Sequence, residues 1–208
     1  MGKTESIKYL GVILDQEVNW KKHILNLKSK LNNVLRYFYF LNPICNKKIL
    51  KMLYFSLVHS RINYRLSCWG GTYDTNLKPI YIQQKMFLRI ISKKGRMEPS
   101  YPLFSDNKVL PLKYMFVFKV LQIFYKVSGN LPEITNLYKD VLRNPKLFVT
   151  PRTHLTNFEK CYIFQGPRIY NKLPTELKTC TDLINFSKKL KCWLLSHESI
   201  DFLTNIQV

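Results

Sequence analysis

Residues 7–23 read IKYLGVILDQEVNWKKH, a short alternating segment followed by a turn, an aromatic residue and the beginning of a basic helix. Apolar residues occur at both odd and even positions from Ile7 to Leu14, so a strand here would have two apolar faces. Other parts of the protein would have to pack against both of them. Asp15–Glu17 is typical of a turn and Val18–Trp20 of a short return strand, with Asn19 as a possible N-cap of the helix. Because one hairpin is not a stable sheet by itself, we expect its neighbouring strands to lie outside this sequence.

The composition indicates a folded, strongly basic chain. It has 208 residues, 46% of them hydrophobic, and 33 Lys and Arg against 13 Asp and Glu give a net charge of +20 and a pI near 9.8. Nucleic acid is the commonest partner of a protein with such an excess of positive charge, followed by an anionic membrane surface. No apolar run reaches membrane-spanning length and the first residues resemble no signal peptide. We therefore expect a nuclear or cytoplasmic chain that is not secreted, although MGKTES fits the loose N-myristoylation pattern at Gly2.

The cysteines give no metal or disulfide pattern. There are five, and no Cys-x-x-Cys occurs among them. The last three, with His197, form a long-spaced group that suggests a metal site only weakly, and buried or incidental thiols in a reducing compartment are the preferred interpretation.

Apolar residues at three- and four-residue intervals predict helices in the first half of the chain. They cover Lys21–Leu41, a segment from Asn46 to about Tyr64, and Ile80–Ser92, with a turn or helix entry at 74–79. Lys93–Arg96 and a proline-containing loop as far as Pro111 then form the clearest linker. We expect three regions: a hairpin at 1–20, a helical region at 21–97 and a C-terminal helical region at 98–208.

The second half mixes helix with irregular chain. Helices are predicted at Leu112–Val127, at Pro132–Arg143 and from Thr181 or Asp182 onward, and Phe158–Pro174 is expected to hold one or two short extended pieces. The predicted fold is mainly α, a helical bundle with a small N-terminal β-hairpin and a short irregular or β segment before the last helix.

A series of short motifs resembles the C-terminal part of reverse transcriptases from non-LTR, jockey-like (LINE) retrotransposons. The matching blocks are Tyr9–Val12 with Asp15, Trp20 and His23; Ser60–Tyr64 with Cys68–Gly70; Gln83–Ile91; Leu110–Leu112; Arg152 with Asn157; and Gly166–Pro174 with Phe186 and Lys188–Leu190. They occur in family order over residues 7–195. The resemblance implies that residues 1–20 are a palm-end β-hairpin, 21–97 a thumb-like helical region and 98–208 the C-terminal helical region.

The resemblance also implies what this chain lacks. In the family, Mg²⁺ ions bound by palm carboxylates upstream of the Tyr-Leu-Gly block align the primer hydroxyl and the nucleotide. This sequence contains no Asp-Asp pair. We therefore expect a non-catalytic fragment of an RNA-directed DNA polymerase, inactive alone, with no catalytic residue, cofactor or metal of its own.

The expected role is sequence-independent binding of an RNA–DNA template-primer, since a thumb grips the duplex backbone. The predicted partners are RNA, RNA–DNA hybrid or DNA, and the missing palm and fingers. The candidate contacts are Lys21, Lys22, Lys28, Lys47, Lys48, Lys51, Lys93, Lys94, Arg96, Arg152 and Arg168. Two alternatives stay open: an independent basic nucleic-acid-binding module, and a non-functional interaction remnant of a truncated element.

Several other residues allow two interpretations. Asp15 and Glu17 suggest metal ligands but fit a turn better, and His23 suggests a base but fits packing or capping better. Trp69 is expected to fill the core at a tight turn. For the Lys93–Arg96 cluster, and for Arg152 and Arg168, phosphate contact and a structural role are equally supported. Among the aromatic residues, Tyr37, Tyr39 and Tyr73 are the candidates for exposed stacking surfaces.

Overall fold

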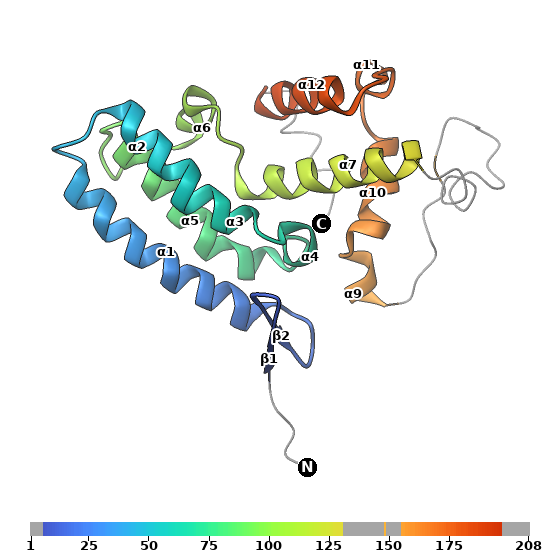
Figure 1. Ribbon diagram of the computed structural model, residues 1–208, viewed down its shortest axis with the longest axis horizontal. Coiled ribbons are helices and arrows are strands. Elements are labelled where there is room, and N and C mark those ends of the chain that lie inside the picture. Colours follow the sequence, from blue (N-terminus) through green and yellow to red (C-terminus); the bar gives the residue numbers. More distant parts are fainter. Residues whose placement is uncertain (1–5, 131–147, 149–154, 197–208) are drawn as a thin grey trace, which may run out of the picture. The chain divides into compact units, whose positions relative to one another are not determined.

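A computed structural model describes residues 6–130, 148 and 155–196 of the chain (Figure 1). The chain divides into two units, Met1–Leu112 and Lys113–Val208. The described residues are mainly helical and carry one two-stranded antiparallel sheet near the N-terminus, as the sequence predicts. Each unit is described by itself.

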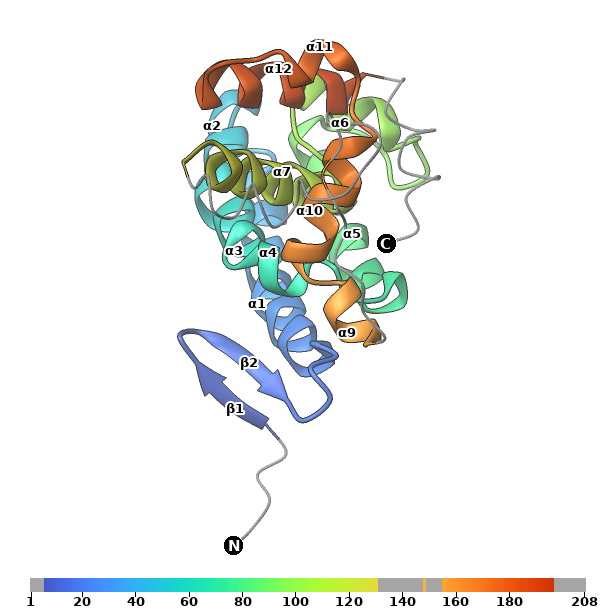
Figure 2. The ribbon, with the colours of Figure 1, turned by 90° about the vertical axis from the view of Figure 1, so that its right-hand side faces the viewer.

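The hairpin turns earlier than the sequence suggested. Strand β1, Ser6–Tyr9, pairs with β2, Val12–Asp15, so the turn is Leu10-Gly11 (Figure 2). Both turn residues have positive φ, 44° for Leu10 and 80° for Gly11, which is the geometry that two-residue hairpins favour. The expected return strand at Val18–Trp20 was wrong, although Asp15 does begin a second turn in which the Val18 N–H donates to the Asp15 carbonyl. The sequence misled because leucine at positive φ is uncommon.

Helix α1, Lys21–Leu41, has the predicted bounds. Its buried side follows the three-four spacing of His23, Ile24, Leu27, Leu31, Val34, Leu35 and Phe38. The Asn19 side chain accepts a hydrogen bond from the Lys21 N–H at 2.9 Å, so it satisfies a free donor of the first turn although Trp20 occupies the N-cap position.

The second predicted helix is nearly continuous but contains a π segment. It comprises α2, Lys47–Leu53, the π-helical turn η1, Tyr54–His59, and α3, Ser60–Asn63. The predicted cap is confirmed, because the Asn46 side chain accepts from the Ile49 N–H at 2.9 Å. The short helix α4, Leu66–Trp69, follows a left-handed residue at Arg65.

Helix α5, Asp74–Ile91, begins six residues before the segment expected to be helical. Pro79 lies inside it, where the sequence indicated a turn or a helix entry. The loop expected after residue 97 contains a further helix, α6, Tyr101–Asn107, with Pro102 in its first turn, where proline is tolerated. The Tyr81 and Phe104 rings stack at 5.9 Å between centroids, so α6 packs on α5 within the first unit.

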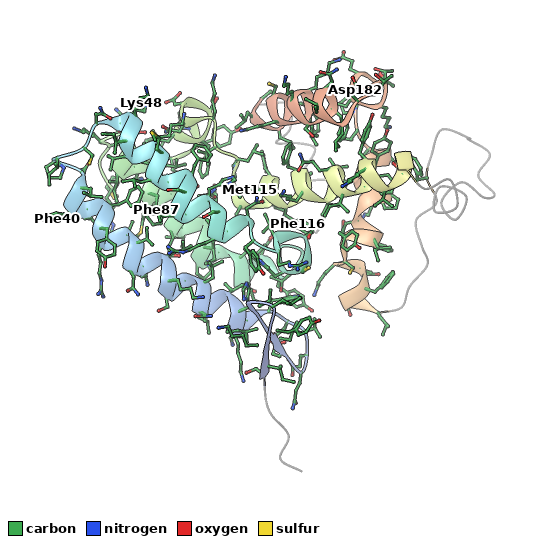
Figure 3. All side chains as sticks on the ribbon, viewed as in Figure 1. Phe40, Lys48, Phe87, Met115, Phe116 and Asp182 are labelled. Carbon is green, nitrogen blue, oxygen red and sulfur yellow. The ribbon has the colours of Figure 1, made fainter. Side chains whose placement is uncertain are left out.

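The core of the first unit lies where α1, η1 and α5 meet. Phe87 of α5 contacts Phe38 of α1 and Tyr54 of η1, with ring centroids 4.9 and 6.2 Å apart, and Figure 3 shows Phe87 among these helices. Gln84 is fully buried, and its amide nitrogen donates to the Leu110 carbonyl at 2.9 Å and to the Tyr54 hydroxyl at 3.2 Å. This polar link joins three separate segments inside an apolar core.

The second unit contains α7, Leu112–Asn130, α9, Thr156–Glu159, α10, Tyr162–Asn171, α11, Thr175–Lys178, and α12, Leu183–Leu195. The extended pieces expected at 158–174 were wrong, since this segment is helical. Gly166 and Pro167 lie buried inside α10, where a hypothetical Cβ on Gly166 would be 2.8 Å from Cδ2 of Phe124. Packing against α7 therefore outweighs the helix-breaking tendency of Gly-Pro. The predicted helix at 132–143 lies outside the described residues.

Candidate nucleic-acid interface

Most of the predicted cations of the first unit gather at two ends of the helical bundle, whereas Lys28 lies within α1. Lys21 and Lys22 open α1, whereas Lys47, Lys48 and Lys51 open α2 after the tight connection that follows the last turn of α1. Helix α5 runs parallel to α1, because Gln83 contacts the middle of α1 and the later Phe87 contacts Phe38. The segment Lys93–Arg96 after α5 therefore lies toward the α2 end. A helix of 21 residues is about 30 Å long, which sets the separation of the two ends.

Most of these candidates are exposed to solvent. Lys21, Lys22, Lys47, Lys48, Lys93, Lys94 and Arg96 are exposed, and Lys28 and Lys51 are half-buried. Figure 3 shows Lys48 pointing away from the bundle near the start of α2. Exposed ammonium groups on fixed helices are suited to contact phosphates without distinguishing bases.

The segment after α5 has a defined conformation. Lys93 has a φ of 52°, and the Arg89 Nη2 donates to the Glu98 carbonyl at 3.0 Å. The Lys94 ammonium lies 3.2 Å from a carboxylate oxygen of Glu98, and this hydrogen bond to Lys94 lowers the pKa of Glu98. Lys94 is therefore partly neutralised, while Lys93 and Arg96 project their charges into solvent.

The structure exposes the expected tyrosines and, among other rings, Phe40. Tyr37, Tyr39 and Tyr73 are 67%, 58% and 52% exposed, which fits a role as stacking surfaces. Phe40 is 71% exposed at the end of α1, and Figure 3 shows it pointing outward. Its sequence position three residues after Tyr37 was a signal that this face of the helix is aromatic.

The cations of the second unit give less information. Arg168 is half-buried in the last turn of α10, and Arg152 lies outside the described residues. Asn171 of the same motif has a structural role, because its side chain donates to and accepts from the backbone of Phe148, at 2.7 and 2.9 Å.

Three residues have the structural roles that the sequence favoured. His23 is 7% exposed, with its ring 5.7 Å from that of Trp69, so it packs. Trp69 is fully buried and its Nε1 donates to the Tyr64 carbonyl at 3.0 Å. Asp15 accepts from the Asn19 N–H at 2.8 Å within its turn.

The five cysteines are free thiols, and each is half-buried or exposed. Within residues 6–130, 148 and 155–196, no group of three or more His, Cys, Asp or Glu is arranged to hold a metal ion. In the same ranges, no helix is both long enough and apolar enough to cross a membrane.

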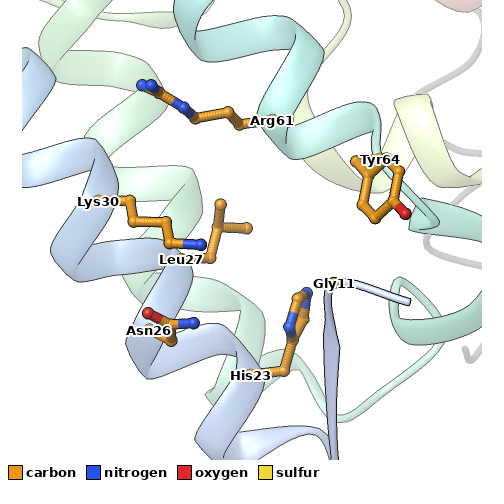
Figure 4. Close-up of a pocket in the computed structure, with 7 residues that line it drawn as sticks. All are labelled: Gly11, His23, Asn26, Leu27, Lys30, Arg61 and Tyr64. Carbon is orange, nitrogen blue, oxygen red and sulfur yellow. The ribbon is translucent and has the colours of Figure 1, made fainter. Parts of the chain in front are cut away.

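The sequence did not single out a small pocket that the structure forms between the hairpin turn, α1 and α3 (Figure 4). It has a volume of about 130 Å³ and is lined by Gly11, His23, Asn26, Leu27, Lys30, Arg61 and Tyr64. Burial and the nearby charge of Lys30 lower the pKa of His23, so its imidazole is neutral at pH 7. The four-residue spacing of Asn26 and Lys30 places both on one side of α1, but only the tertiary structure brings Arg61 to them.

Comparisons with protein-family models, with curated proteins and with solved structures find no match to this chain.

Proposed function

We propose that the chain is the thumb and C-terminal part of an RNA-directed DNA polymerase of a non-LTR retrotransposon, and that it binds the template-primer through its phosphate backbone. The observation that carries the proposal is the gathering of exposed cations at both ends of a helical bundle about 30 Å long. The net charge of +20 supplies the long-range attraction. The catalytic carboxylates and their Mg²⁺ would belong to the palm of the same polymerase.

A thumb needs rigid helices and adaptable contacts. The Phe38–Phe87–Tyr54 cluster and the Gln84 hydrogen bonds fix the bundle, while the lysines lie outside that core. Lysine contacts phosphate as a flexible point charge, which suits binding that does not depend on base sequence.

The proposal is tested by fluorescence anisotropy with an RNA–DNA primer-template over a salt series, with duplex DNA as competitor. Each neutralised phosphate should contribute a slope of about −0.9 in log K against log salt on a B-form duplex. In the Lys47→Gln/Lys48→Gln variant, the slope should become less steep by the contribution of about two phosphates. The matched control is Lys188→Gln/Lys189→Gln, an equal charge change at two exposed positions of α12.

Three results separate the proposal from its rivals. Preference for the hybrid over duplex DNA supports the thumb role, and equal affinity for both favours an independent basic module. Salt-insensitive or absent binding by the wild type contradicts both.

The exposed hairpin favours the second candidate function, docking to a missing palm. Ile7, Tyr9 and Leu10 are 60%, 62% and 59% exposed, although they belong to an apolar strand and its turn. Apolar surface of this kind indicates a protein contact. Addition of a palm fragment should reduce binding of the dye ANS, and unchanged dye binding would contradict this role.

A further inference from the structure

We propose that the pocket between the hairpin turn, α1 and α3 is a phosphate-binding site, and that the phosphate it receives belongs to the backbone of a bound nucleic-acid strand. The second half of this inference rests on the proposed function. The first half, the affinity for a phosphate group, stands on the pocket alone.

The charges that line the pocket favour an anion. Lys30 of α1 and Arg61 of α3 supply two cations from different helices, and the lining contains no carboxylate. Figure 4 shows the Lys30 ammonium beside Leu27, whereas Arg61 extends from α3 with its guanidinium turned away from His23. Neither side chain forms an ion pair with any of the residues that the structure describes.

Neutral donors complete the site. Asn26 is half-buried beside Lys30 and offers an amide N–H₂ group. His23 accepts from the Ile13 N–H at its Nδ1, at 3.4 Å, so the neutral ring carries its proton on Nε2 and can donate there. Lys30, Arg61, Asn26 and His23 therefore offer hydrogen-bond donors from two helices, as a tetrahedral oxyanion requires.

The hairpin turn closes one end of the pocket in a fixed geometry. The Tyr64 hydroxyl donates to the Leu10 carbonyl at 2.7 Å, which ties the turn to the end of α3. Gly11 has a φ of 80°, and a hypothetical Cβ on it would lie 3.3 Å from Cε1 of Tyr64. Because the turn is held this closely, the pocket is part of the fold and does not depend on a ligand to form.

A phosphate fits the pocket in both size and charge. The volume of about 130 Å³ is several times the roughly 30 Å³ that one water molecule occupies in the liquid, which leaves room for a tetrahedral group. Arginine and lysine together are a common phosphate-binding pair, the first by its planar fork and the second as a point charge.

The experiment follows the His23 imidazole signals by NMR while inorganic phosphate is added to the full chain. Saturable movement of these signals is expected, since the ring lines the pocket. In the Lys30→Gln/Arg61→Gln variant, phosphate affinity should fall about tenfold or more, because charge-assisted hydrogen bonds are lost. The control is Lys188→Gln/Lys189→Gln, which changes the net charge equally at exposed positions of α12 and should leave the titration unchanged.

Two further probes identify the source of the phosphate. A dinucleotide with one internal phosphodiester and no terminal phosphate should move the same signals, as a backbone site requires. Movement with inorganic phosphate and a nucleoside monophosphate, but not with the dinucleotide, would overturn the backbone assignment. In the Lys30→Gln/Arg61→Gln variant, the slope of log K against log salt for hybrid binding should also become less steep by about 0.9, the contribution of one phosphate.

Failure of the phosphate-site proposal and failure of the proposed function give different results. If the wild type binds the hybrid but no phosphate probe moves the His23 signals, the pocket is not a phosphate site and the proposed function survives. If phosphate moves the signals but the hybrid does not bind, the pocket stands and the proposed function fails. Equal phosphate affinity in the two double variants would also overturn the site.

Discussion

Gly166 shows how one residue sets the distance between two helices. A Cβ at this position would lie 2.8, 3.1 and 3.2 Å from three atoms of Phe124, so α10 approaches α7 more closely than a side chain allows. Gly166→Ala should therefore lower the free energy of unfolding by about 1–3 kcal/mol through overpacking, even though alanine favours helix. Urea denaturation measures the change.

Gly95→Ala is the matched control for this prediction. The exposed Gly95 has only one atom within reach of an added Cβ, the Glu98 Oε1 at 4.0 Å. The control should change stability by no more than about 0.5 kcal/mol. Equal effects at the two glycines would show that Phe124 moves aside and that the close approach has no energetic consequence.

His23 makes the stability of the first unit depend on pH. Burial, and then the charge of Lys30, lower its pKa from the ordinary value of 6.5. Between that value and the lower folded pKa, the unfolded chain binds more protons than the folded chain. The free energy of unfolding should therefore fall as the pH drops below 6.5, and it should level off below the folded pKa.

Urea denaturation at a series of pH values measures this dependence. His23→Gln retains an acceptor for the Ile13 N–H but cannot titrate, so the variant should be less sensitive between pH 6.5 and 5 than the wild type. Parallel curves for the two proteins would assign the pH dependence to other groups.

Within the elements, α5 is held by a buried amide. Gln84 is fully buried, and its amide nitrogen donates to the Leu110 carbonyl at 2.9 Å, which fixes the segment before α7. Gln84→Met keeps a similar shape but leaves this carbonyl without its donor, so the free energy of unfolding should fall by about 1–3 kcal/mol. Lys78→Met, at an exposed position of the same helix, should change it by less than about 0.5 kcal/mol. A Gln84→Met variant as stable as the wild type would contradict a stabilising role for the hydrogen bond.

The segment after α5 allows a gain in nucleic-acid affinity. Glu98 partly neutralises Lys94 across 3.2 Å. Glu98→Gln removes a negative charge and releases the ammonium, so affinity for the hybrid at low salt should rise a few-fold. Asp106→Asn makes the same charge change on α6 and serves as the control.

The comparison of these two variants separates local from general electrostatics. A larger gain from Glu98→Gln than from Asp106→Asn, measured by anisotropy, places the segment after α5 in the interface. Equal gains in affinity would mean that only the net charge matters. The segment after α5 would then not contact the nucleic acid.

The elements differ in how well the sequence predicts them, for physical reasons. Helix α1 was predicted to the residue because its buried stripe and the following Pro43 are local signals. The hairpin turn and α10 were not, because a left-handed Leu10 and a buried Gly-Pro pair are tolerated only through contacts distant in sequence. The same holds for the candidate sites. Single cations can be proposed from composition, whereas the pocket forms only because the fold brings α1, α3 and the hairpin turn together.

At the scale of the whole molecule, the separation of the two basic ends predicts a length requirement for the ligand. Helix α1 spans about 30 Å, and an A-like RNA–DNA hybrid rises about 2.8 Å per base pair, so about eleven base pairs are needed to reach both ends. A hybrid of about 6 base pairs should contact one end only, and one of about 12 should contact both. The longer hybrid should therefore show a steeper salt slope, by about 0.9 for each additional phosphate contacted.

Anisotropy titrations with the two hybrids over the same salt series test this requirement. Lys47→Gln/Lys48→Gln removes cations from one end only, so it should bring the slope of the longer hybrid toward that of the shorter one. If the slope does not depend on length, the ends do not act on one ligand. The binding surface would then be a single patch, and the thumb-like grip along the bundle would have to be abandoned.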